Sequence, residues 1–100
     1  MDKAQKFELM NKVVRELEDL QNSQTALITK ISQIEVDNMN GLNDSRLEKD
    51  LSEMHSKIAE NNDAITEIFA YFENKRDEYG EKNGAAIAAI EAAAAVEAVK

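Results

Sequence analysis

The fold is decided by residues 47–79, LEKDLSEMHSKIAENNDAITEIFAYFENKRDEY. Apolar positions in this stretch follow one another in alternating steps of four and three, the heptad spacing of packed helices. The positions in this repeat are Leu47, Leu51, Met54, Ile58, Asn61, Ile65, Ile68, Phe72, Lys75 and Tyr79. The stretch predicts a long helix with one apolar stripe, and Asn61 is a polar residue inside that stripe.

A helix with the same periodicity is predicted over residues 3–38. Its stripe contains two columns of residues spaced by seven: Met10, Leu17, Gln24 and Ile31, and Val13, Leu20, Leu27 and Ile34. Phe7, Val14 and Ile28 occupy a neighbouring column, which makes the stripe wider than a two-helix pair needs. We therefore expect the hairpin to associate into a bundle. The side chains expected to face a partner are Phe7, Val14, Ile28, Phe69, Ile87 and Ile90.

A turn is predicted over residues 39–45, between these two helices. Asn and Asp residues are frequent here, and Gly41 can adopt the left-handed conformation that ends a helix. Ser45 and Glu48 have the spacing of a capping box, so we expect the second helix to cover residues 46–79.

The two stripes predict how the helices pair. In an antiparallel hairpin closed near residue 42, the numbers of facing residues sum to about 85. Gln24 then lies opposite Asn61, so the polar interruptions of the two stripes meet. We interpret this pair as a buried amide layer that sets the register. The alternative is that both amides lie at a solvent-exposed edge.

The C-terminal part of the chain has a different composition. Gly80 and Gly84 bracket a predicted linker over residues 80–84. Residues 85–100 are rich in Ala, the residue with the highest helix propensity, so a third helix is expected there. The overall prediction is an all-α protein, with a coiled-coil-like antiparallel hairpin over residues 1–79 and an Ala-rich C-terminal helix. That helix either docks on a partner or frays as a loosely packed end.

Composition argues against several classes of function. The chain has no Cys, and its net charge of −8 disfavours nucleic acid and anionic membranes as partners. No stretch approaches the ~20 apolar residues of a membrane span. His55 is the only histidine, and no nucleophile or second metal ligand has a useful spacing from it. We expect no catalytic residue, no metal site and no cofactor, and therefore a protein that is not an enzyme.

The hairpin resembles the small early-secreted-antigen-like partners of type VII secretion systems, a family named for a Trp-x-Gly turn. Met39-Asn40-Gly41 occupies the place of that turn, and Met39 stands where the family has Trp. Residues 45–68 look like the second helix of such proteins, and the resemblance spans roughly residues 5–80. It implies a secreted or effector-partner hairpin that pairs with itself or with a larger helical protein.

A second hypothesis is a phage or virion structural protein, scaffolding protein or assembly chaperone, because an acidic coiled coil is joined to an Ala-rich helix. A third is a small helical inhibitor that masks a basic enzyme surface, which the negative charge allows. The first six residues lack the apolar run of a secretory signal. The expected locations are the cytoplasm, the exterior after export without a cleaved signal, or a virion.

Overall fold

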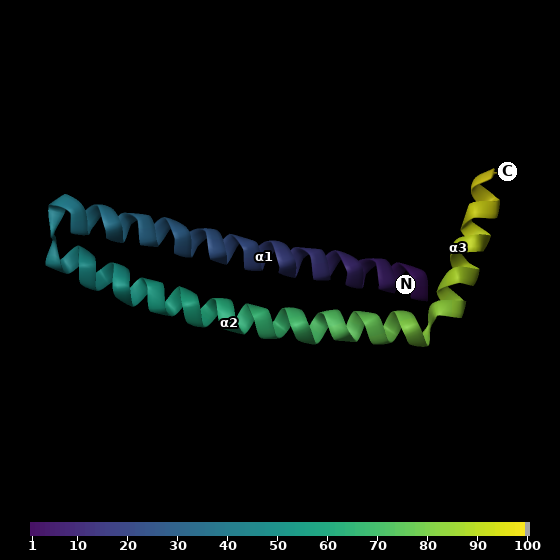
Figure 1. The fold of residues 1–100 in the computed structure, drawn as a ribbon. Helices are drawn as coiled ribbons and strands as arrows, with labels where there is room; N and C mark the ends of the chain where they lie inside the picture. Colours follow the sequence, from purple (N-terminus) through teal and green to yellow (C-terminus); the bar gives the residue numbers. More distant parts are fainter. Residues whose placement is uncertain (100) are drawn as a thin grey trace. The chain divides into compact units, whose positions relative to one another are not determined.

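The computed structural model describes residues 1–99, which are helical except at short connections (Figure 1). The elements are α1 (Lys3–Asp37), the π-helical turn η1 (Asn38–Leu42), α2 (Ser45–Lys82) and α3 (Gly84–Val99). Residues 1–99 contain no strand, which confirms the predicted all-α class. Lys100, the last residue of the predicted Ala-rich helix, lies outside the described residues.

Helix α1 begins with a reciprocal pair of hydrogen bonds between Asp2 and Gln5. The backbone N–H of Gln5 donates to Oδ1 of Asp2 (2.7 Å), and the backbone N–H of Asp2 donates to Oε1 of Gln5 (3.0 Å). This arrangement is a capping box, which gives partners to N–H groups that have none within the helix. The N-terminus of α1 is therefore fixed by its own sequence.

The turn between α1 and α2 is built around the side chain of Asn38, which is only 3% exposed. Its Oδ1 accepts a hydrogen bond from the backbone N–H of Asp44 (3.0 Å), and its Nδ2 donates to the Asp44 carbonyl oxygen (3.1 Å). The left-handed residue is Asn43, with φ 51° and ψ 38°, whereas Gly41 has no positive φ. The prediction for Gly41 was therefore wrong. Asn also tolerates this conformation, since its short polar side chain can hydrogen-bond locally.

The N-terminal cap of α2 is Asp44, which corrects the predicted capping box at Ser45. Oδ1 of Asp44 accepts a hydrogen bond from the backbone N–H of Leu47 (2.8 Å), and its carbonyl oxygen accepts from the backbone N–H of Glu48 (3.0 Å). A carboxylate at this position also interacts favourably with the helix dipole. Ser45 is consequently the first residue of α2 rather than its cap.

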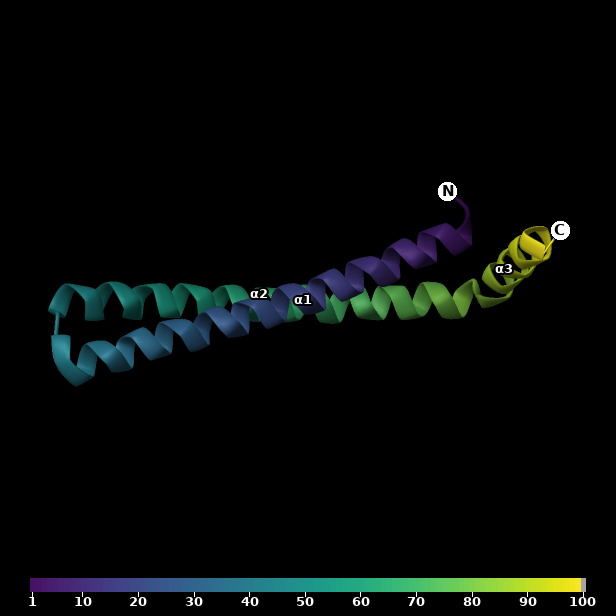
Figure 2. The ribbon, with the colours of Figure 1, turned by 90° about the horizontal axis from the view of Figure 1, so that it is seen from above.

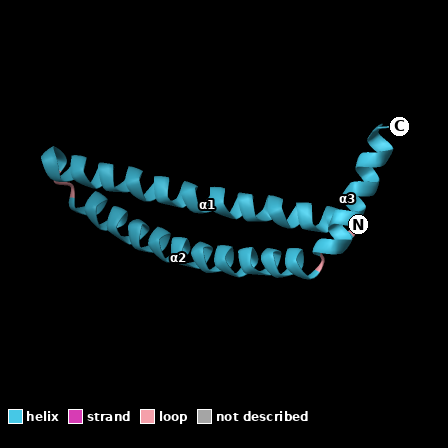
Figure 3. Ribbon diagram, turned by 45° about the vertical axis from the view of Figure 1, so that its right-hand side comes forward, coloured by secondary structure: helices cyan, strands magenta, loops and turns pink. Residues whose placement is uncertain are grey.

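The predicted linker over residues 80–84 is shorter in the structure. Helix α2 continues through Gly80 to Lys82, and only Asn83 separates it from α3 (Figure 3). A Cβ atom at Gly80 would lie 2.7 Å from Cε2 of Phe7. Gly80 therefore allows a close approach to an aromatic ring and is not part of a loop.

The chain divides into two compact units, each of which contains an antiparallel pair of helix segments. The turn unit consists of Glu18–Ile68. In it, the C-terminal part of α1 and the N-terminal part of α2 lie side by side and are connected by η1 (Figures 1 and 2). Its buried apolar side chains are Ile31, Leu51 and Ile65. The predicted antiparallel hairpin is therefore present in this unit, where it is closed by its own turn.

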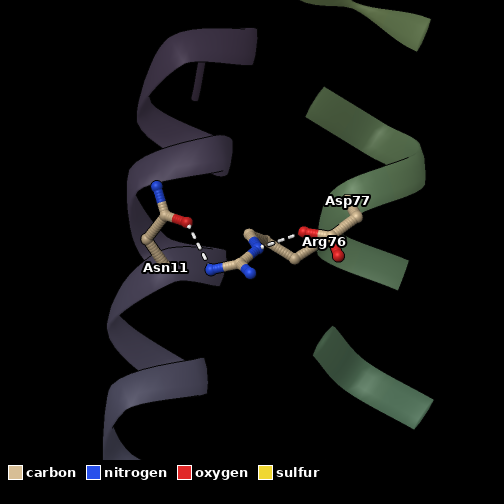
Figure 4. Close-up of polar contacts among 3 residues, drawn as sticks. All are labelled: Asn11, Arg76 and Asp77. Atoms are coloured by element: carbon tan, nitrogen blue, oxygen red, sulfur yellow. Dashed lines mark hydrogen bonds and ion pairs between the residues drawn. The ribbon is translucent and has the colours of Figure 1, made fainter. Parts of the chain in front are cut away.

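The second unit joins residues 1–17 with the chain from Phe69 onward. Phe7 stacks on Tyr79 with ring centroids 6.5 Å apart, and Nζ of Lys6 lies 5.1 Å from the Tyr79 ring centroid. Arg76 of α2 bridges to α1, because its Nη1 donates to Oδ1 of Asn11 (3.2 Å; Figure 4). Its Nε donates to Oδ1 of the adjacent Asp77 on the same helix (2.9 Å). The buried side chains here are Ala4, Met10, Val14 and Ile87.

Candidate helix-association surface

In the turn unit, one of the predicted stripe columns of each helix is turned outward. On α1, Ile31 is buried and Ile28 half-buried, whereas Leu27 and Ile34 are exposed. On α2, the column of Leu51, Ile58 and Ile65 faces inward, and the column of Met54, Asn61 and Ile68 is exposed. Two helices can bury only part of a three-column stripe, so the third column remains available to solvent.

The predicted contact between Gln24 and Asn61 is present in the structure. Nδ2 of Asn61 donates to Oε1 of Gln24 over 3.2 Å. Asn61 is exposed and Gln24 is half-buried, so the pair lies at the edge of the interface. This position corrects the interpretation of a buried layer and agrees with the alternative of a solvent-exposed edge.

The same hydrogen bond shows that the exposed columns of α1 and α2 lie on one side of the unit. Leu20 and Leu27 are neighbours of Gln24 on the surface of α1, four residues before it and three after it. Met54 and Ile68 lie one heptad before and after Asn61 on α2. We call this surface the apolar edge. Its aliphatic side chains and their exposures are Leu20 (45%), Leu27 (42%), Ile34 (45%), Met54 (43%) and Ile68 (52%).

The opposite edge of the turn unit is polar. There, Nε2 of Gln21 donates to Oγ1 of Thr66 over 2.7 Å. The exposed residues beside Gln21 are Glu18 and Thr25, three before and four after it, and Ala59 and Ser52 lie one and two heptads before Thr66. Ile28, one heptad after Gln21, is half-buried. The two edges of one unit therefore differ in chemistry, since only one of them presents a row of large aliphatic side chains.

None of the six residues expected to face a partner is fully exposed, and their contact with a partner stays a prediction. Val14 and Ile87 are buried, and Phe7, Ile28, Phe69 and Ile90 are half-buried. Phe7 is half-buried because its ring stacks on Tyr79. Burial of an aromatic ring contributes more to stability than burial of an aliphatic side chain. The turn unit also exposes Val36 (47%), Met39 (71%) and Leu42 (72%) near its turn, but the apolar row that runs along both helices is the apolar edge. Periodicity signalled that a wide stripe would leave one column uncovered.

Ionisable groups in the turn unit form few contacts between the helices. Nδ1 of His55 lies 3.3 Å from Oε1 of Glu35, and both side chains are about one-third exposed (37% and 33%). The pair is an ion pair only when His55 is protonated. Within residues 1–99, no group of three or more His, Asp or Glu side chains is arranged to hold a metal ion.

The surface depressions near the turn are open rather than enclosed. One of them is lined by Leu42, Asp44, Arg46, Leu47 and Asp50. Across the described residues, no helix combines the length and apolar character needed to cross a membrane.

Comparisons with models of protein families, with curated proteins and with solved structures find no match to this chain.

Proposed function

We propose that the protein is a non-catalytic helix–helix association module that uses the apolar edge of its turn unit to bind another helical protein. The observation that carries this proposal is the row of five aliphatic side chains, each 42–52% exposed, on one edge of the unit. Covering the remaining surface of one such side chain contributes about 1 kcal/mol. Five of them together make a contribution comparable to the lower estimates of the cost of association.

The biological setting that we favour is a type VII-like secretion system, in which the protein would be a small secreted hairpin or the partner of a larger effector. Support comes from the hairpin, from the place of Met39-Asn40-Gly41 at its turn and from the exposed edge. Such a partner would contribute helices that complete a bundle with α1 and α2.

Helix α3 favours an alternative, a structural, scaffolding or assembly-chaperone protein of a phage or virion. Residues 91–96 are exposed, and Val96 is 61% exposed. An Ala-rich helical surface allows another helix to approach closely. The two settings are distinguished by which part of the chain a partner covers, the apolar edge or α3.

The test compares the natural protein with the variant L20S/L27S/I34S, which removes the aliphatic side chains of α1 from the apolar edge. Each protein is mixed with the helical proteins encoded next to it, and complexes are measured by light scattering after size exclusion. We expect complexes with the natural chain, or its self-association, to be lost in this variant. The control T25S changes the polar edge and should leave association unchanged.

Two results would contradict the proposal. One is a protein that stays monomeric and binds none of the neighbouring gene products. The other is association that L20S/L27S/I34S leaves unaltered while its circular dichroism remains helical. Association that survives this variant but is lost on removal of residues 91–100 would instead support the assembly role of α3.

A further inference from the structure

Building on the proposed function, we infer that the apolar edge is covered by the same edge of a second copy of this chain. The two copies are related by a two-fold axis between the levels of Asn61 and Leu27, and this axis reverses the direction of the helices. A two-fold interface brings one patch against itself, so the patch must be complementary to itself. The apolar edge meets this requirement in its layers and in its amides, and the reversed orientation keeps its two central lysines apart.

The apolar edge consists of three layers, one heptad apart, because Gln24 and Asn61 fix the register of the two helices. In this register Asn61 is level with Gln24, so the column of Leu20, Leu27 and Ile34 is staggered by about three residues against the column of Ile68, Asn61 and Met54. The nearest members of the two columns form the layers Leu20/Ile68, Leu27/Asn61 and Ile34/Met54. The reversing axis places the first layer against the third layer of the other copy, so aliphatic side chains meet aliphatic side chains. The middle layer then meets its own copy.

The middle layer decides between the two possible orientations. With reversed helices, Leu27 meets Leu27 and Asn61 meets Asn61 across the axis. With helices in the same direction, α1 of one copy lies over α2 of the other, and Asn61 would lie between the aliphatic side chains of Leu20 and Leu27. An amide buried against an aliphatic side chain loses its hydrogen bonds to water without replacement, so this orientation is unfavourable.

The Asn61 amide has the donors and acceptors that the reversed orientation needs. One hydrogen of its Nδ2 is directed to Oε1 of Gln24 in the same chain. A side-chain amide has a second hydrogen on this nitrogen and lone pairs on its oxygen. Across the axis, each Asn61 Nδ2 can donate this hydrogen to the Asn61 Oδ1 of the other copy.

The lysines beside the middle of the apolar edge also favour the reversed orientation. Lys30 on α1 and Lys57 on α2 are both exposed, and each lies next to the middle layer. Reversed helices bring Lys30 toward Ser23 of the other copy and Lys57 toward Ala64. Helices in the same direction would bring Lys30 toward Lys57, and this juxtaposition of like charges is destabilising.

Single-cysteine variants of the full chain test the orientation, because the chain has no cysteine of its own. Under mild oxidation, we expect L27C to form a disulfide-linked dimer with itself. The control T25C, on the polar edge, should remain a monomer on a non-reducing gel. Same-direction helices would instead give a cross-link in a mixture of L27C with N61C and little in L27C alone, and this outcome would overturn the proposed axis.

Sedimentation equilibrium of the uncross-linked protein tests whether the second copy is the partner. We expect a dimer whose dissociation constant rises about tenfold or more in L27S and falls in N61L, because leucine would replace the paired amides at the axis. A natural protein that stays monomeric at several hundred micromolar would overturn self-pairing. If another helical protein is then bound through the apolar edge, the proposed association function stands without the self-pairing.

Discussion

At the residue scale, Asn38 holds the turn together. Its side chain makes both hydrogen bonds that connect the end of α1 to Asp44 at the start of α2. Because Asn38 is buried, neither backbone group of Asp44 has a simple replacement partner if the amide is lost. The turn therefore depends on one side chain more than on its glycine.

We expect Asn38→Ala to lower the free energy of unfolding by about 2 kcal/mol, because two part-buried backbone groups lose their partners. The measurement is urea denaturation followed by circular dichroism. Asn40→Ala is the matched control, since Asn40 lies in the same turn and is exposed. An equal effect of the two substitutions would show that the amide of Asn38 has no special part in the turn.

Gly80 gives a second prediction at the residue scale: the effect of Gly80→Ala on stability should depend on whether the Phe7 ring is present. A Cβ atom at this position would lie 2.7 and 2.9 Å from ring atoms of Phe7, whose ring stacks on Tyr79. We expect Gly80→Ala to be destabilising by about 1 kcal/mol, since overpacking outweighs the gain in helix propensity.

In the Phe7→Ala background the obstruction is absent, so Gly80→Ala should become stabilising by up to about 1 kcal/mol. The four proteins of this double-mutant cycle are compared by thermal unfolding. Equal effects of Gly80→Ala in both backgrounds would mean that the Phe7 ring does not limit this position.

At the scale of elements, the N-termini of α1 and α2 are each fixed by the side chain of an Asp residue. Asp2 pairs with Gln5 at the start of α1, and Asp44 accepts the N–H of Leu47 at the start of α2. A cap that closes a turn also aligns the two helices that it joins. The cap of α2 is therefore important for the register of the hairpin.

We expect Asp44→Ala to cost about 1 kcal/mol of stability, the usual value for the loss of an N-cap side chain. Ser45→Ala should change the stability by only a few tenths of that amount, because Ser45 is already inside α2. Both variants are measured by denaturation at the same pH. A larger effect of Ser45→Ala would restore the capping box that the sequence predicted.

Much of the secondary structure could be predicted from the sequence, because heptad spacing and the absence of Pro dictate long helices. The register was also predictable, since Gln24 and Asn61 are spaced to meet. Which column of α1 faces α2 could not be predicted, because all three candidate columns of the first helix carry aliphatic residues. A rotation of one helix by a fraction of a turn exchanges these columns without changing the spacing.

Asn61 and Asn62 illustrate the same limit in two adjacent residues. The heptad pattern assigned the interface position to Asn61, but the structure leaves that residue exposed and makes Asn62 half-buried. Oδ1 of Asn62 is buried and makes no hydrogen bond within the described part of the chain. Whether a polar atom is buried without a hydrogen bond depends on how the helices pack, and the spacing of residues in the sequence does not reveal this.

At the scale of the whole molecule, association and stability are linked. If copies pair through the apolar edge, the midpoint of thermal unfolding should rise by several degrees over about a hundredfold increase in protein concentration. The rise should disappear in L20S/L27S/I34S, whose exposed side chains no longer favour pairing. Differential scanning calorimetry provides the measurement. A midpoint that is independent of concentration in the natural protein would exclude pairing in that range.

The hydrogen bond between Gln21 and Thr66 has a consequence for how many copies can assemble. It marks an edge of hydroxyl and amide groups that has no large aliphatic side chain to offer another molecule. Of the two edges of the unit, only the apolar edge can therefore pair in this way. Under the proposed pairing, the two copies cover each other's apolar edge and the polar edge offers no second one, so pairing through this edge closes at two copies.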